Sequence, residues 1–317
     1  MKNRFKYLVP IIIVMLFICA FLNNKKEKPS DNIVLTQEIF ASFTHGILDP
    51  DPEIRNLVYD GKNVTVQYNI LNGEQDASFG LLIFTNGVLQ PFCINDGSDT
   101  TMYRFNVLKN QSVTFPISFD PVQLNEKENT VYFLLMLDPD FYPEDKTQPF
   151  GHNHSISQLL PWKLVNNSAG SRTSKINIAS IENFQQKQIE KSPPEFDQKD
   201  QKSDSPLELN INSECPIELN NNAKKISVPL NISSKINGKY RVSVFINHEP
   251  INAFDGCDYI DIDCDKDTNY KLTVNIDSSD LKDSNNFAYA IAVPVDYNFD
   301  GLDIQVAKSA SVILINQ

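Results

Sequence analysis

Short runs of β-branched and aromatic residues, separated by turn signals, dominate the chain after residue 60. Apolar and polar residues alternate in Val64–Tyr68 and in Leu272–Ile276, which would place one face of each extended segment in a core and the other in water. Apolar residues are continuous in Leu81–Phe84 and Phe133–Leu137, as expected of central strands covered on both faces. With Asn-Gly, Asp-Gly and proline clusters between the runs, the pattern predicts an all-β chain of the antiparallel β-sandwich type.

The same order of segments occurs twice. Gly80–Asn86 (GLLIFTN) and Tyr240–Asn247 (YRVSVFIN) both end in Phe-x-Asn. Each is followed by a phenylalanine and then an Asp-Gly pair, Phe92 before Asp96–Gly97 and Phe254 before Asp255–Gly256. Three further pairs are Asn63–Ile70 with Lys225–Ile232, Tyr103–Val107 with Tyr270–Val274, and Tyr132–Asp138 with Tyr289–Asp296. We therefore predict two tandem, internally duplicated β-sandwich domains of the immunoglobulin-like (Ig-like) type.

The amino-terminal segment has the order of an export signal or a membrane anchor. Lys2, Arg4 and Lys6 precede an apolar run over residues 7–22, and a polar, lysine-rich stretch follows. The run is longer than most signal-peptide cores (~7–15 residues) and shorter than the ~20 residues that span a bilayer comfortably. An uncleaved transmembrane helix, a cleaved signal and lipidation at Cys19 all remain open. We expect the bulk of the chain to be extracellular, with residues 7–22 contacting the cell membrane.

These patterns divide the chain into four parts. Residues 1–30 are a stub and anchor, 31–182 the first sandwich with a lead-in, 183–206 a charged flexible linker, and 207–317 the second sandwich. The linker is assigned because it has few apolar residues and dense charge of both signs. A helix over Ile181–Lys191, stopped by Pro193 and Pro194, is the competing prediction. Closing strands are expected at Ile176–Ile181 and Ser311–Ile315.

Charge and composition narrow the partners. The 317 residues include 28 basic and 40 acidic side chains, giving a net charge of −12. Nucleic-acid binders gather Lys and Arg on one face, and no such face is evident, so a nucleic-acid partner is not expected. Abundant Asn, Lys, Ile and Asp is typical of AT-rich bacterial genomes.

Two acidic stretches suggest Ca²⁺, which takes oxygen ligands. Asp261 and Asp263, with two further aspartates, alternate with Ile262 and Cys264, so their carboxylates would share one face of an extended strand. An acidic edge strand that discourages edge-to-edge pairing is the alternative.

The second stretch places Asp296, Asn298 and Asp300 just before Gly301. It resembles the opening of an EF-hand or dockerin calcium loop, D-x-N-x-D-G, in which alternate oxygens converge on the ion. It departs from that family at Asp303 and Ala307, and a plain Asp-Gly turn is the alternative.

Motifs for catalysis are sparse. His152 and His154 lack partners at zinc spacing, and there is no Gly-x-Ser-x-Gly, although triads also assemble from distant residues. Cys257 and Cys264 either bridge across a hairpin or stay as buried thiols.

We interpret the chain as a membrane-tethered binding or adhesion protein of the bacterial cell envelope, leaning away from an enzyme. An envelope protein or glycan would be its ligand, and no cofactor is required apart from a candidate Ca²⁺. The alternatives are an envelope hydrolase with its site in Asp138–Trp162 of the first domain, or a passive structural spacer.

Overall fold

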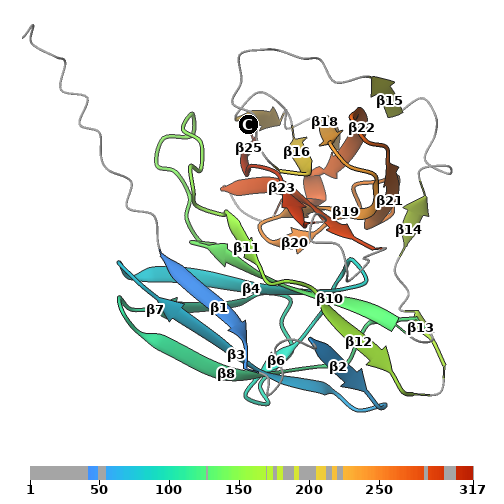
Figure 1. The fold of residues 1–317 in the computed structure, drawn as a ribbon. Helices are drawn as coiled ribbons and strands as arrows, with labels where there is room; N and C mark the ends of the chain where they lie inside the picture. Colours follow the sequence, from blue (N-terminus) through green and yellow to red (C-terminus); the bar gives the residue numbers. More distant parts are fainter. Residues whose placement is uncertain are drawn as a thin grey trace, which may run out of the picture. The chain divides into compact units, whose positions relative to one another are not determined.

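The protein is all-β in the computed structural model, which describes residues 42–48, 55–125, 128–168, 170–173, 177–180, 189–192, 205–211, 216–219, 224–281, 285–295 and 305–316 (Figure 1). Residues 41–317 form one compact unit. Residues 1–40 lie outside the described ranges. The expectations for the anchor over residues 7–22 therefore fall outside the described structure. In the part of the chain that the structure describes, no helix has the length and apolar character needed to cross a membrane.

The strands are β1 Phe43–Ile47, β2 Asn56–Tyr59, β3 Val64–Asn72, β4 Ala77–Thr85, β5 Val88–Leu89, β6 Cys93–Ile94, β7 Tyr103–Val107, β8 Ser112–Phe119, β9 Gln123–Leu124, β10 Glu128–Leu137, β11 Ile156–Gln158, β12 Trp162–Asn166, β13 Arg172–Thr173, β14 Ile178–Ser180, β15 Ile189–Ser192, β16 Leu207–Ile211, β17 Ile217–Leu219, β18 Lys225–Ser234, β19 Gly238–Ile246, β20 Glu249–Pro250, β21 Tyr259–Cys264, β22 Thr268–Asp277, β23 Asn286–Pro294, β24 Ala307–Lys308 and β25 Val312–Asn316. The 3₁₀ turn η2, Ser278–Asp280, follows β22.

Residues 42–173, the first half, form a sandwich of two main sheets. The first outer sheet has the order β1-β3-β8-β6, and the first inner sheet has the order β2-β12-β10-β4-β5, with β7 on β4 and β11 on β10. Their facing side chains form the first core, in which Tyr68, Phe115 and Phe133 pack together. The predicted alternation is confirmed in β3, whose buried and more exposed positions follow one another along the strand.

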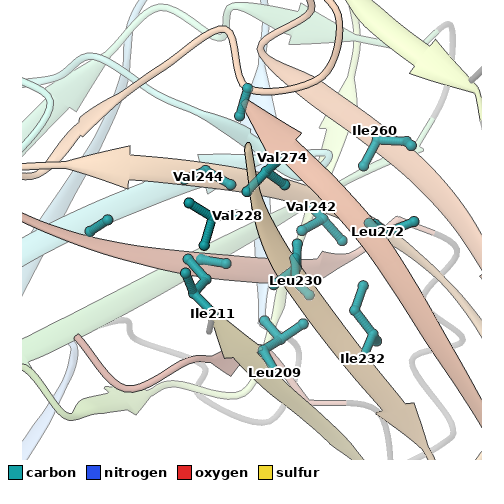
Figure 2. Packing of buried hydrophobic residues seen from close by; sticks show 14 of the residues in the cluster. Leu209, Ile211, Val228, Leu230, Ile232, Val242, Val244, Ile260, Leu272 and Val274 are labelled. Carbon is teal, nitrogen blue, oxygen red and sulfur yellow. The ribbon is translucent and has the colours of Figure 1, made fainter. Parts of the chain in front are cut away.

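Residues 177–316, the second half, repeat this construction. The second outer sheet has the order β15-β22-β18-β16, and the second inner sheet has the order β14-β21-β19-β23-β25-β17, with β20 on β19 and β24 on β23. Figure 2 shows the second core, where Leu230, Val242 and Leu272 gather between the two sheets. Each half therefore has the two-layer architecture that buries one face of each sheet.

Several strand pairings of the first half recur in the second, although the edge strands β6 and β15 come from different places in the chain order. β12 pairs parallel with β2 and antiparallel with β10, as β25 does with β17 and β23. The predicted equivalence of Tyr103–Val107 with Tyr270–Val274 is wrong. Tyr103–Val107 lies in β7, which pairs with β4, and the strand in the corresponding place beside β19 is β21. Tyr270–Val274 lies in β22 of the outer sheet. Both segments alternate in the same phase, so periodicity alone aligned them although they lie in different sheets.

A third apolar cluster, the interface layer, lies between the two inner sheets. On β10, Tyr132, Leu134 and Met136 enter this layer, while the residues between them enter the first core. On β23, Tyr289 and Ile291 enter it, while alternate alanines enter the second core. The central strands are thus covered on both faces, which confirms the prediction drawn from their continuous apolar runs.

Two equivalent turns close the sides of this layer. Asn86 and Gly87 have φ of 49° and 76°, and Asn247 and His248 have φ of 49° and 70°, so both hairpins use two left-handed residues. A Cβ on Gly87 would come within 2.8 Å of Arg241 Cβ, so this turn packs directly against the second half. The other turn packs against the first half, where His248 Nε2 donates to Pro139 O over 2.6 Å. The halves thus contact each other through corresponding surfaces, as in a two-fold interface.

Two short strands lie near the expected boundary between the halves. β14, expected to close the first sandwich, pairs in parallel with β21 of the second inner sheet. β15 lies inside the segment expected to be a linker and pairs with β22 of the second outer sheet. The rest of 183–206, apart from residues 205 and 206, lies outside the described residues.

We predict that Phe245→Ala lowers the free energy of unfolding by about 3–5 kcal/mol, the usual cost of deleting a buried aromatic ring. Phe245 is 0% exposed, stacks on Tyr289 at 5.1 Å and meets Phe84 of the first half edge-on at 6.5 Å. Urea unfolding of residues 41–317 measures the change. Leu71→Ala, at a 48% exposed position, is the control and should change it by less than about 0.5 kcal/mol. Equal effects of the two substitutions would contradict a buried interface layer.

Candidate functional site

The residues expected to bind Ca²⁺ are only partly described. Asp296, Asn298 and Asp300 lie outside the described ranges. Asp263 is exposed, and Asp261 is partly buried on β21, with Ile262 buried between them as the alternation predicted. Within the described ranges, no three His, Cys, Asp or Glu side chains form a group able to hold a metal ion.

Asp261 is engaged by a guanidinium. Arg241, 7% exposed, donates from Nε to Oδ1 over 2.7 Å and from Nη2 to Oδ2 over 2.8 Å. Its Nη1 donates to Asn86 O across the interface over 2.8 Å. A cation at Asp261 would have to compete with this bidentate pair, so the geometry favours a structural role for the carboxylate.

The structure describes three cysteines, Cys93, Cys257 and Cys264, and none of them takes part in a disulfide. The alternative of a Cys257–Cys264 disulfide is therefore not formed in this structure. Cys264 instead packs in the second core, with Cys257 against the edge of that core.

One serine–histidine pair forms from distant residues of the first half. His45 on β1 bonds Ser157 Oγ on β11 at 3.0 Å through Nε2, and Tyr68 Oη at 2.6 Å through Nδ1. Burial lowers the pKa of His45 to about 4 and raises that of Tyr68, so both are neutral near pH 7. A neutral phenol does not stabilise an imidazolium as a triad carboxylate does. The network satisfies the buried Tyr68 hydroxyl and ties β1 to β11.

A pocket of about 380 Å³ lies where two loops of different halves meet. The loop between β10 and β11 contributes Phe150 and His154, and β11 contributes Ile156. The segment from β24 to β25 contributes Lys308 and Ser311. Ligand sites form preferentially at such junctions, and apolar walls with a few convergent polar groups are their usual lining. This junction is the candidate site that the described structure supports best.

Lys308 is the central polar group of the pocket. Its Nζ donates to Ser309 O over 2.9 Å and to Ser311 Oγ over 3.2 Å, and it lies 4.3 Å from the centroid of the Tyr289 ring. Burial lowers the pKa of Lys308 to about 7, because the charged form loses its hydration. Near neutral pH the amine is therefore divided between its charged and neutral forms.

A hydrogen-bonded chain leads from Lys308 into the interface. Ser311 Oγ accepts from Lys308 and contacts His154 Nδ1 at 3.0 Å. Burial, then the charges of Lys308 and His248, lower the pKa of His154 to about 3, while nearby backbone carbonyls of Phe141 and Pro139 act in the opposite direction. The neutral ring fits this contact when its Nδ1 accepts from the Ser311 hydroxyl and its proton is on Nε2. Ser311 thereby holds its lone pairs toward the ammonium.

His248 completes the buried group beside the pocket. Its Nδ1 bonds Tyr289 Oη at 2.9 Å, and its ring centroid lies 5.4 Å from that of His154. Burial lowers the pKa of His248 to about 4. His248 and His154 both have left-handed φ, of 70° and 63°, a conformation that favours Gly or Asn. The contacts of the two rings offset this strain.

No family model matches the chain, and no curated protein matches it. Among solved structures, the Clostridium thermocellum CbhA fibronectin(III)-like modules align at TM-score 0.21 and 8% identity, over 86% of this chain and 93% of that one. Red sea bream transglutaminase aligns at 0.22 and 8%, over 87% of this chain and 31% of that one. The CsuC-CsuE chaperone-tip adhesion subunit complex of Acinetobacter baumannii aligns at 0.22 and 9%, over 85% and 98%. At these scores the likenesses add no detail to the sheet arrangement.

Sequence reasoning named one residue of the pocket, His154, and set it aside for lack of zinc partners. Lys308 and Ser311 carry no local motif, and they meet His154 only through packing between the halves. One signal was present, a lysine in an otherwise small and apolar stretch from Val306 to Val312. A charge flanked by buried positions indicates either a partner or a function.

We predict that acid destabilises the protein through its buried histidines. In the folded state His154 and His248 stay neutral down to pH values of about 3 and 4, whereas in the unfolded chain they protonate near 6.5. The stability they contribute is complete above pH 6.5 and is lost as the pH falls toward 4, with a slope of about 1.4 kcal/mol per pH unit for each histidine.

Denaturant unfolding at pH 7, 6, 5 and 4 measures this slope. His154→Gln should flatten it, whereas His152→Gln, at an exposed position of the same loop, should leave it unchanged. An identical slope in wild type and His154→Gln would show that this ring titrates freely.

Proposed function

We propose that the chain is a membrane-tethered, extracytoplasmic binding protein whose ligand site is the pocket between its two β-sandwiches. The pocket itself carries the proposal: a cationic side chain, a hydroxyl and an aromatic ring from two halves converge on about 380 Å³ of space. Volumes of roughly 300–1,000 Å³ at domain junctions are characteristic of small-ligand sites.

Rigidity of the surroundings supports recognition at this site. The interface layer packs the two inner sheets together, and polar bonds across it include Arg241 Nη1 to Asn86 O and Leu89 N–H to Tyr259 Oη at 3.2 Å. A further bond beside the pocket runs from Val306 N–H to Gln158 Oε1 over 2.8 Å. A pocket whose walls are fixed before binding loses less entropy when a ligand enters.

The tether and the duplication belong to the same proposal. The basic, apolar and polar order of residues 1–28 supports attachment through residues 7–22 and an outward-facing remainder. The recurring strand pairing supports descent of both Ig-like modules from one ancestor, and the corresponding interface surfaces are those expected if that ancestor formed a two-fold dimer.

A binding experiment with two matched tryptophan variants tests the proposal. Residues 41–317 are screened against arrays of envelope glycans and peptides. Ala310→Trp places an indole at an exposed position in the pocket lining, while Gln111→Trp places the same group in the exposed turn between β7 and β8. We expect specific binding that Ala310→Trp abolishes and Gln111→Trp retains.

Two outcomes contradict the assignment. Binding that both variants retain would move the ligand away from the pocket. Turnover of an array member that Ser157→Ala abolishes would favour the hydrolase, because His45 is hydrogen-bonded to that serine.

The calcium site is proposed separately, on the spacing of Asp296, Asn298 and Asp300 before Gly301. A bound ion should stabilise the folded state by about 2.7 kcal/mol at a hundredfold excess over its dissociation constant. The melting temperature of residues 41–317 should rise with Ca²⁺ and fall with chelator, Asp300→Ala should remove the response, and Asp99→Ala, at an exposed site of the first half, should preserve it. A melting temperature indifferent to millimolar Ca²⁺ leaves a plain Asp-Gly turn.

A further inference from the structure

We infer that the pocket takes a small carboxylate-bearing ligand, held by the Lys308 ammonium beside the apolar wall that Phe150 contributes. This inference rests on the proposed function, because it names the class of ligand for the same pocket.

The first step is the charge of Lys308. Among the described residues it forms no ion pair, and its Nζ contacts are a carbonyl, a hydroxyl and an aromatic face. Lys308 is partly buried, and an ammonium group that loses hydration is normally paired, because losing hydration without a counter-charge is costly. A carboxylate reaching Nζ would supply that counter-charge in a partly enclosed site, where charge-assisted hydrogen bonds are strongest.

The second step is that neighbouring polar groups are already engaged. Ser309 Oγ accepts from Ala290 N–H over 2.9 Å and donates to Ala310 O over 2.9 Å. Ser311 Oγ is shared between Lys308 and His154. Asn153 Nδ2 donates to Phe150 O over 3.0 Å. The ammonium is therefore the strongest donor that the described lining presents to a ligand.

The third step concerns the other charges near this group. Arg104 on β7 pairs with Asp140 at 2.9 Å, so these two charges largely cancel. His154 on the β10–β11 loop and His248 on the β19–β20 turn are neutral near pH 7, since burial lowers the pKa of each to about 4 or below. Tyr289 on β23, whose pKa burial raises, is neutral as well. The field in the pocket is therefore set by Lys308 and favours an anion.

The fourth step is the size and lining of the space. Phe150 and Ile156 supply apolar walls, and about 380 Å³ lies near the lower end of the range for small-ligand sites. One ring with a carboxylate fits such a volume. Both an acidic sugar unit of an envelope glycan and the carboxyl-terminal residue of a peptide offer this chemistry.

Calorimetric titration of residues 41–317 tests the inference with four probes. The acids are glucuronate, for the sugar source, and N-acetyl-phenylalanine, for the peptide source, and each is compared with its methyl ester. We expect one acid to bind and its ester to bind roughly tenfold or more weakly, because the ester keeps the ring and loses the charge. Which acid binds identifies the source.

Two variants and a pH series locate the effect. Lys308→Met keeps the length of the side chain and should remove the preference for the acid, whereas Lys109→Met makes the same charge change at an exposed turn and should preserve it. Affinity for the acid should decline as the pH rises above about 7, where Lys308 loses its proton. This pH series uses the wild-type protein, so it decides the question even if Lys308→Met fails to fold.

The results separate this inference from the proposed function. Equal affinity for acid and ester, or acid binding unchanged in folded Lys308→Met, overturns the carboxylate assignment while pocket binding stands, provided that Ala310→Trp still blocks it. Absence of binding by all four probes at millimolar concentration also overturns the carboxylate assignment. The proposed function fails if no array ligand depends on the pocket, or if an array member is turned over and Ser157→Ala abolishes the turnover.

Discussion

The apolar layer between the two inner sheets is the contact on which the rest of the structure depends. β4 and β10 of the first half and β19 and β23 of the second each turn one face to their own core and the other to this layer. Removing the layer would expose Phe84 and Phe245, which meet edge-on, and Tyr289, which stacks on Phe245. Burial of such rings contributes about 1.5–3 kcal/mol each, and the polar bonds across the interface add to this.

Polar groups lie where loops cross the edge of this layer. Their contacts and their burial account for a left-handed backbone at His248 and for lowered pKa values. His248 has a left-handed backbone where the equivalent residue of the first half is Gly87, and its ring links Tyr289 Oη to Pro139 O. Lys308 and His154 meet through Ser311 on the neighbouring side. Desolvation lowers the pKa of all three basic groups. The interface between the halves therefore combines low hydration with a titratable group, Lys308, that lines a pocket. This combination is frequent at functional sites.

The fold was predictable where local pattern and burial agree. Continuous apolar runs identified β4 and β10 as central strands, and alternation identified the faces of β3 and β21. Partner choice was not predictable, because β7 and β22 share one periodicity but belong to different sheets. The residues that form the pocket were even harder to predict from the sequence. His154 and Lys308 are 154 residues apart, and they converge only because the interface layer positions two loops that have no motif in common.

Native-state hydrogen exchange on residues 41–317 tests the central claim most directly, that the two sandwiches form one cooperative structure through their shared layer. The most protected amides of β4 and β10 should exchange with the same opening free energy as those of β19 and β23, because breaking the layer exposes both inner sheets together. If the amides of one pair of strands exchanged with a distinctly lower opening free energy while the other pair stayed protected, the halves would open independently. That result would contradict the account.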